Sequence, residues 1–295
     1  MGYGSYNAKD WGKLKDSKGI GNAGSVKEIF VRREIDPRFD PKYIAVREAR
    51  DSEDHPNSTP IILGLDVTGS MGYLSEQIAK EALNETMLKL YSTNIIEDPA
   101  ILFAAYGDYR DYAPLQVTQF ESDIRIAEQL LDLWLEDAGS GQVVPYLLWY
   151  FAGKHTKLDA YDNHDKKGFL ITIGDDAECR FDNTADTIQR VFGEIGPGVE
   201  ACLAAAKEKF EVMHIFIGEP EKSAKKFMKL LPGRTMTIGK NDITYLPQIL
   251  ISAMQIAGGT SVDDSVEQWD VLARPIVRKA VGSLTVGGKK KGIFF

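Results

Sequence analysis

The sequence predicts an α/β protein with a mostly parallel central sheet and helices on both faces of that sheet. Short apolar runs of strand length alternate with longer stretches of helical periodicity from residue 61 to residue 257. Such alternation is typical of a doubly wound sheet. Several runs are apolar without interruption, as strands buried on both faces are. Ligands of such sheets bind at the carboxyl ends of the strands, so we expect the functional residues there.

The strands are predicted where apolar residues follow one another. The first two runs cover residues 61–65 and 101–105. Residues 115–120 alternate between apolar and polar side chains, which predicts a strand at the edge of the sheet. Three further strands are predicted over residues 168–173, 212–217 and 235–238.

Between these strands, apolar residues recur at helical spacing. Within residues 73–91, for example, Leu74, Ile78, Ala82 and Met87 fall on one stripe, as on the buried face of an amphipathic helix. The other predicted helices cover residues 122–136, 143–154, 184–193, 198–209, 221–231 and 243–257.

The chain divides into three parts by composition. Residues 58–257 hold the alternating pattern and have the size of one domain. Residues 1–57 are predicted to be an N-terminal extension that packs on the core through its aromatic residues, with short strands over 27–33 and 43–50. Residues 258–295 are predicted to be a C-terminal extension with a basic tail, which is either a disordered terminus or docks on a partner or on the acidic core.

The charge is unevenly distributed along the chain. It has 35 Lys and Arg against 43 Asp and Glu, a net charge of −8. Residues 61–270 carry 18 basic and 33 acidic residues, whereas residues 271–295 carry six basic residues and no acidic one. An acidic protein is a poor general binder of nucleic acid, and a strongly negative domain attracts cations. We therefore expect no specific nucleic-acid partner.

The sequence argues against several other classes of protein. No run of about 18 apolar residues is present, so no membrane span is predicted. The first residues lack the basic and apolar regions of a signal peptide. Cys179 and Cys202 are too few for a disulfide framework or a four-cysteine zinc site. We therefore expect a cytoplasmic protein that does not act at a membrane.

Oxygen-bearing side chains follow two of the predicted strands. Asp66 ends the first strand, and the hydroxyls of Thr68 and Ser70 come two and four residues later. Three oxygen donors on one tight loop suit a hard divalent cation such as Mg²⁺, although Ser70 could simply cap a helix and Thr68 a turn. Asp175 follows the strand over 168–173. Two carboxylates at one edge repel each other without a cation.

These residues resemble the von Willebrand factor type A (vWA) family. The segment Asp66-x-Thr68-x-Ser70 matches the family's first metal motif, Asp175 matches its acidic residue after the fourth strand, and residues 106–111 are similar to a segment of integrin-β-like members. The resemblance covers residues 58–257. It implies a three-layer, Rossmann-like vWA fold with one antiparallel edge strand in an otherwise parallel sheet.

The resemblance further implies a metal-ion-dependent adhesion site (MIDAS). Thr68 and Ser70 would bind Mg²⁺ directly, with Mn²⁺ or Ca²⁺ as alternatives, and Asp66 and Asp175 would bind it directly or through water. The third loop departs from the family pattern, because the family's threonine is replaced there by Ser140 or Gln142. We favour Ser140, and an ordinary turn residue is the alternative.

The resemblance also implies a protein partner. An acidic residue of that partner completes the metal shell in the family, and intracellular relatives often work beside AAA+ ATPases of the MoxR type. We therefore expect a binding module for adhesion or scaffolding that is not an enzyme.

Two other functions remain open. In a phosphatase of the haloacid dehalogenase type, Asp66 would be the nucleophile and Asp175 a Mg²⁺ ligand. The second acid expected two residues after the nucleophile is Thr68 here, which argues against this reading. The other alternative is an assembly protein whose metal site has lapsed.

Polar residues near the predicted site have simpler interpretations. Asp108 and Asp111 follow the second strand and could support the metal, but the preferred prediction is that Asp111 and Arg110 form an exposed ion pair. Cys179 is predicted to be inert packing. His214 lies inside a predicted strand and is expected to be a core residue.

Overall fold

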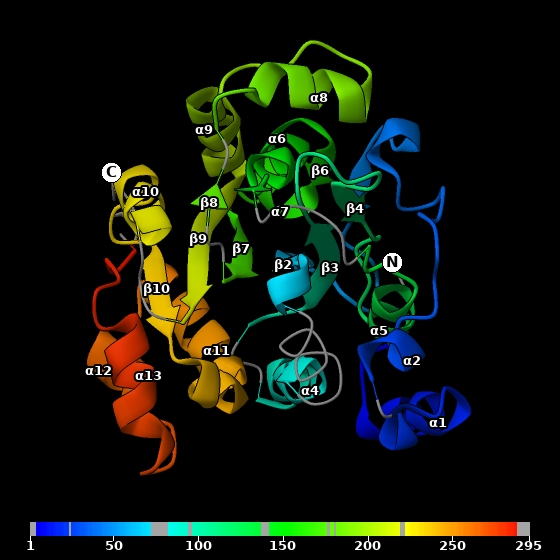
Figure 1. Cartoon of the computed structure of the whole chain (residues 1–295). Coiled ribbons are helices and arrows are strands. Elements are labelled where there is room, and N and C mark those ends of the chain that lie inside the picture. The colour runs from blue at the N-terminus through cyan, green and yellow to red at the C-terminus, as the bar shows by residue number, and fades with distance from the viewer. Residues whose placement is uncertain are drawn as a thin grey trace.

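A computed structural model describes residues 4–23, 25–71, 82–93, 96–136, 142–175, 178–179, 181–218 and 222–287. Its centre is a six-stranded sheet in the order β10-β9-β7-β2-β3-β4 (Figure 1). The strands are β2 (Thr59–Asp66), β3 (Pro99–Tyr106), β4 (Leu115–Val117), β7 (Gly168–Gly174), β9 (Phe210–Ile217) and β10 (Thr235–Ile238). Every neighbouring pair is parallel except β3 with the edge strand β4. The predicted fold class is therefore confirmed.

Helices cover both faces of this sheet (Figure 1). One layer includes α6 (Tyr146–Lys154), α8 (Thr184–Phe192) and α9 (Val199–Lys209), and the other includes α4 (Leu83–Thr93) and α11 (Leu246–Ala257). Side chains of β2 alternate between the two cores, because successive residues of a strand point to opposite faces. Ile62 lies in the core beneath α6, whereas Ile61, Leu63 and Leu65 lie in the core beneath α11.

Each predicted helix has a counterpart, with small shifts at the ends. Of the helix predicted over 73–91, residues 73–81 lie outside the described residues. The helix predicted over 243–257 begins as a 3₁₀ turn, η5 (Lys240–Tyr245), and continues as α11. The remaining helices between strands are α5 (Arg125–Leu131), α7 (Asp159–Asp162) and α10 (Lys222–Leu230).

The N-terminal residues pack on the main core. They include α1 (Ala8–Ser17), α2 (Val26–Ile29) and β1 (Arg47–Ala49), which pairs in parallel with β6 (Thr156–Leu158). Tyr6 and Trp11 are buried in the core that contains α11. The short 3₁₀ turns of this region are η1 (Ile20–Asn22) and η2 (Pro41–Tyr43).

The strand predicted over 27–33 is wrong. Its first residues belong to the short helix α2, and the rest is irregular. Ile29 and Phe30 are both buried in the same core. Adjacent residues of a strand point to opposite faces, so two consecutive core residues favour a turn of helix over a strand.

Other residues of the N-terminal extension cover the outer edge of the sheet, along β4 and the residues that follow it. The N–H of Val117 in β4 donates to the carbonyl oxygen of Phe39 at 2.9 Å. Further along, the N–H of Tyr6 donates to the carbonyl of Ser122 at 2.9 Å. The carbonyl of Phe39 thus accepts the hydrogen bond from Val117 that a further strand would accept at this edge.

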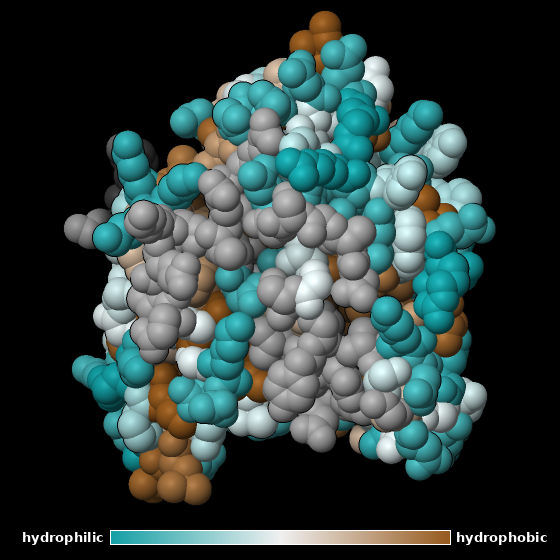
Figure 2. Space-filling model, viewed as in Figure 1, coloured by the Kyte–Doolittle hydropathy of each residue, from teal (hydrophilic) through white to brown (hydrophobic). Residues whose placement is uncertain are grey.

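The C-terminal residues add two helices to the core beneath α11. They are α12 (Val262–Glu267) and α13 (Ala273–Val281), and the indole N–H of Trp269 donates to the hydroxyl of Ser252 in α11 at 2.8 Å. Val271 and Leu272, between α12 and α13, are about three quarters exposed. Figure 2 shows an apolar tip where Figure 1 places this helix pair. The basic tail from residue 288 lies outside the described residues.

None of the helices in the described ranges is long and apolar enough to cross a membrane. The longest described apolar helix, α11, has twelve residues and is buried against the sheet. A membrane-spanning helix needs about 20 apolar residues.

His214 is a core residue, as predicted. It is fully buried in β9, its Nδ1 lies 2.8 Å from the hydroxyl of Thr172, and its ring stacks on Phe227 with centroids 3.7 Å apart. Burial lowers the pKa of His214 to about 3, because the charged imidazolium would lose its hydration. The imidazole is therefore neutral over the physiological range.

Helices α6 and α9 approach each other closely at Gly153. A Cβ atom at this position would lie 2.7 Å from the Cβ of Ala205 and 2.9 Å from its carbonyl carbon. Because the second of these neighbours is backbone, no side-chain rotation relieves the overlap. The small residues on both helices therefore set how closely the two helices pack over the sheet.

Candidate functional site

The strand order reverses between β2 and β7. From β2 the chain builds outward through β3 and β4 on one side, and through β7, β9 and β10 on the other. Leu65 is in register with Ile173, so Asp66 and Asp175 leave adjacent strands at the same edge. In open parallel sheets, this point of reversal is where ligands bind. The two predicted acids therefore lie at the point where the strand order reverses, as the sequence predicted from their positions after β2 and β7.

Asp66 and Thr68 are held together by a tight turn. Asp66 is fully buried, and its Oδ1 accepts hydrogen bonds from the N–H of Thr68 at 2.8 Å and from the hydroxyl of Thr68 at 2.7 Å. An aspartate that accepts from the backbone two residues later forms a typical Asx turn. The turn fixes the direction of the carboxylate and brings the threonine hydroxyl beside it.

The loop then forms a 3₁₀ turn, η3 (Gly69–Met71), closed by a hydrogen bond from the N–H of Met71 to the carbonyl of Thr68 at 2.9 Å. Ser70 lies within this turn, and its side chain is outside the described structure. Its roles as metal ligand or helix cap both stay predictions.

Asp175 forms an ion pair with Lys240. Its side chain is only 7% exposed, and its Oδ2 lies 3.3 Å from the Nζ of Lys240. Lys240 begins η5, two residues after the end of β10, and its side chain is 59% exposed. The ammonium group therefore neutralises part of the negative charge at this edge of the sheet.

The third loop is described only at its end. Ser140 lies outside the described residues. Gln142 begins β5 (Gln142–Val143), which pairs in parallel with β8 (Glu178–Cys179). The N–H of Gln142 donates to Oδ2 of Asp108 at 2.9 Å, and its carbonyl accepts from the N–H of Tyr109 at 3.3 Å. Its backbone thus ties the third loop to the loop after β3.

Asp111 does not form the predicted exposed ion pair with Arg110, and that prediction is wrong. Asp111 is 4% exposed, and its Oδ2 accepts from the N–H of Asp108 at 2.8 Å. Arg110 instead donates from Nε to the hydroxyl of Tyr109 at 2.7 Å. The physical reason is local: the loop folds back on itself, so the aspartate carboxylate replaces a backbone acceptor inside the turn.

Asp108 and Asp111 together organise the loop after β3. Asp108 is fully buried and accepts from the N–H of Arg110 at 2.9 Å as well as from Gln142. A Cβ at Gly107 would lie 2.3 Å from Oδ2 of Asp111, so only glycine leaves room for the carboxylate. In the sequence, this turn is indicated by Gly107 directly after the strand, followed by aspartates at positions 108 and 111.

The Asp111 carboxyl is buried without full compensation. Its Oδ1 has no hydrogen-bond partner within the described part of the chain. Burial raises the pKa of Asp111 to about 7, and the carboxylates of Glu136 and Asp108 add to that rise. The loop is otherwise well held, since the guanidinium of Arg190 donates to the carbonyl of Asp111 at 3.0 Å.

The donors at the edge of the sheet are carboxylate and hydroxyl oxygens, which suit Mg²⁺, Mn²⁺ or Ca²⁺ better than softer metals. Within the described ranges, no three His, Cys, Asp or Glu side chains form a group that could hold a metal ion. The predicted site depends on fewer acids, because hydroxyls supply the other ligands. The structure brings Asp66 and Thr68 into contact and starts Asp175 from the adjacent strand.

Comparisons with known proteins add likeness in fold only. No protein-family model matches the chain, and no curated protein matches it. Among solved structures, the pilus adhesin SpaC from Lactobacillus rhamnosus GG in its open conformation is 10% identical, with a TM-score of 0.45 over 66% of this chain and 30% of that chain. A von Willebrand factor type A protein from Catenulispora acidiphila is 16% identical, with a TM-score of 0.39 over 70% and 44%. The likeness therefore spans less than half the length of either structure.

Proposed function

We propose that this chain is a metal-dependent protein-binding module that works in adhesion or as a scaffold, and not as an enzyme. The observation that carries the proposal is the paired Asp66 and Thr68 at the point where the strand order reverses, with Asp175 directly after the adjacent strand β7. Ser70, and Ser140 or Gln142, would complete the ligand set.

A bound Mg²⁺ would supply a positive coordination position that a carboxylate can fill. The residues of this chain orient that position. The Asx turn holds the Asp66 carboxylate and the Thr68 hydroxyl side by side before any ligand arrives. The excess of acidic residues between positions 61 and 270 raises the local concentration of cations. An acidic residue of a protein partner, for which an AAA+ ATPase is our candidate, would then bind at the metal.

Replacing Asp66 with asparagine should abolish saturable Mg²⁺ binding in isothermal titration calorimetry. Asparagine keeps the Oδ1 that accepts from Thr68 but removes the charge, so the fold and melting temperature should change little. Asp186→Asn is the matched control, because it removes the same charge from an exposed position in α8. Capture of a protein partner should be lost with Asp66→Asn or with a chelator, and retained with the control.

Three outcomes would contradict this proposal. If Asp66→Asn binds Mg²⁺ with the same affinity as the unmodified chain, Asp66 is not a ligand of the metal. The absence of metal binding by the unmodified chain at millimolar Mg²⁺ would indicate an assembly protein with a lapsed site. Mg²⁺-dependent turnover of an aryl phosphate that disappears in Asp66→Asn would indicate the phosphatase instead.

Removing the ammonium group of Lys240 should strengthen Mg²⁺ binding. Lys240→Met leaves Asp175 without the cation that now lies 3.3 Å from its carboxylate, so a metal ion no longer competes with it. Because Lys240 is largely exposed, we expect a gain of about 0.5–1 kcal/mol, roughly two- to fivefold in affinity. Lys225→Met, at an exposed position of α10, is the control for net charge. Equal affinities of the two variants would rule out competition by Lys240.

A further inference from the structure

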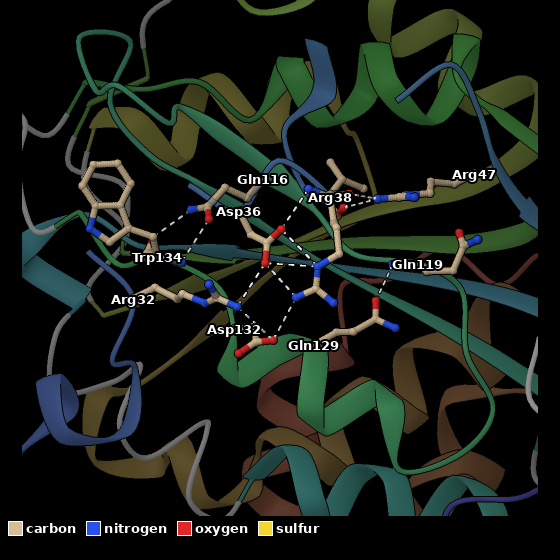
Figure 3. A network of polar contacts seen from close by, with 10 residues as sticks. Arg32, Asp36, Arg38, Arg47, Gln116, Gln119, Gln129, Asp132 and Trp134 are labelled. Carbon is tan, nitrogen blue, oxygen red and sulfur yellow. Dashed lines mark hydrogen bonds and ion pairs between the residues drawn. The ribbon is translucent and has the colours of Figure 1, made fainter. Parts of the chain in front are cut away.

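A hollow of about 440 Å³ lies between the N-terminal extension and the edge of the sheet. Residues 37–47 form one side of it. Gln119, in the loop between β4 and α5, and Gln129, in α5, form the other. Figure 3 shows this region, with Arg38, Arg47, Gln119 and Gln129 grouped around it. The hollow lies at the β4 edge and belongs to neither of the strands that carry Asp66 and Asp175.

Two arginines beside the hollow are already neutralised. Arg38 binds Asp36 at 2.7 Å and Asp132 at 3.1 Å. Arg32 lies 3.1 Å from the same Asp36 and 3.5 Å from the same Asp132. Two guanidinium groups and two carboxylates therefore form one balanced cluster, visible at the centre of Figure 3.

Arg47 has no such counter-charge. Its Nη2 donates to the carbonyl oxygens of Arg38 and Val117, the latter at 3.1 Å. Its Nε is buried without a hydrogen-bond partner, and no acidic side chain in the described ranges pairs with it. Burial lowers the pKa of Arg47 to about 10, so the guanidinium stays charged at neutral pH. A partly buried charge without an opposite charge is costly, and an anion in the hollow would offset that cost.

The walls of the hollow offer a further donor and an apolar rim. Gln129 accepts from the N–H of Gln119 at 2.8 Å, whereas the side-chain Nε2 of Gln119 has no partner in the described part of the chain. Tyr43 is 67% exposed and Val46 is 42% exposed at the mouth. One uncompensated positive charge, an amide donor and exposed apolar side chains thus surround the same space.

We propose that this hollow binds a carboxylate-bearing peptide segment of a protein partner. The carboxylate of an Asp or Glu would face Arg47 and the amide of Gln119, and an apolar neighbour would cover Tyr43 and Val46. Arginine binds carboxylates with charge-assisted hydrogen bonds. A single uncompensated guanidinium matches a monoanion. A dianionic phosphate would keep one negative charge without a counter-charge, because Arg32 and Arg38 are already paired with Asp36 and Asp132. This binding needs no metal.

The test uses the peptide Ac-Leu-Glu-Leu-NH2 and its Gln analogue, titrated into the full chain in the presence of a chelator. We expect the Glu peptide to bind with a dissociation constant below about 5 mM, weak as fits a short peptide. The Gln analogue should bind at least tenfold more weakly. The side-chain amide signals of Gln119 and Gln129 in the NMR spectrum should shift with the Glu peptide.

Variants of the chain localise the binding. Arg47→Met should lower the affinity for the Glu peptide at least tenfold. Arg33→Met, which removes an exposed arginine outside the hollow, should leave that affinity unchanged. Because Arg47 also holds two backbone carbonyls, its loss could prevent folding. Tyr43→Ser changes an exposed side chain and should weaken binding two- to fivefold in a folded protein.

Several results would overturn the inference. They are equal affinity for the Glu and Gln peptides, no binding at 5 mM, unchanged affinity in a folded Arg47→Met variant, and binding that appears only when Mg²⁺ replaces the chelator. The last result would place the carboxylate at the metal site and support the proposed function. Failure of the metal site alone would leave binding in chelator intact, so the two proposals fail separately.

Discussion

Replacing Gly153 with valine is expected to lower the free energy of unfolding by about 3 kcal/mol. The new Cβ would overlap both the Cβ and the carbonyl carbon of Ala205 across the α6–α9 contact. The two helices must then move apart, which loosens the core beneath α6 that contains Leu148 and Trp149. Urea unfolding followed by circular dichroism measures the change.

Gly12 provides the matched control. It also lies in a helix, α1, but a Cβ there has no neighbour within 4 Å. Gly12→Val should therefore change the free energy of unfolding by less than about 1 kcal/mol. Similar losses for the two variants would show that the approach of α6 to α9 does not govern the effect, because helix propensity itself favours valine over glycine.

Replacing Asp111 with asparagine should remove a pH dependence of stability. In the unfolded chain this carboxyl ionises near pH 4, whereas in the folded protein burial raises its pKa to about 7. Between these values the folded state binds the extra proton, so its stability falls as the pH rises. The loss is about 1.4 kcal/mol per pH unit and about 4 kcal/mol in total.

The comparison between the two proteins isolates this group. Urea unfolding between pH 4 and pH 8 gives both stability curves, and the titration of His214 and of other groups that do not interact with Asp111 cancels in their difference. The unmodified chain should lose about 4 kcal/mol relative to Asp111→Asn across this range. Asp186→Asn, at an exposed position, should run parallel to the unmodified chain. A parallel curve for Asp111→Asn would mean that the Asp111 carboxylate is already ionised in the fold.

Most of the central sheet could be predicted because its signal is local. Each buried strand is an uninterrupted apolar run, and each connecting helix has apolar residues at helical spacing, so the pattern alone indicates the element. The edge strand β4 was indicated by its alternation, although it is shorter than residues 115–120. The strand predicted over 27–33 failed because its apolar residues pack in a way that only three-dimensional neighbours reveal.

The candidate site was predictable in part for a similar reason. Asp66, Thr68 and Asp175 follow apolar runs, so the parallel arrangement already puts them at one edge. The pairing of Asp175 with Lys240 joins residues 65 positions apart and left no local signal. Asp111 was predicted as exposed because an aspartate beside an arginine usually is. Its burial depends on the turn that Asp108 closes, which composition does not indicate.

The cover over β4 changes how a shortened chain should be interpreted. Residues 58–257 carry the sheet and the predicted site, but without Phe39 the N–H of Val117 loses its acceptor. Open strand edges invite pairing with other chains. The fragment would therefore gain an adhesive surface of its own, and any partner it captured through that edge would say nothing about the partner of the intact protein.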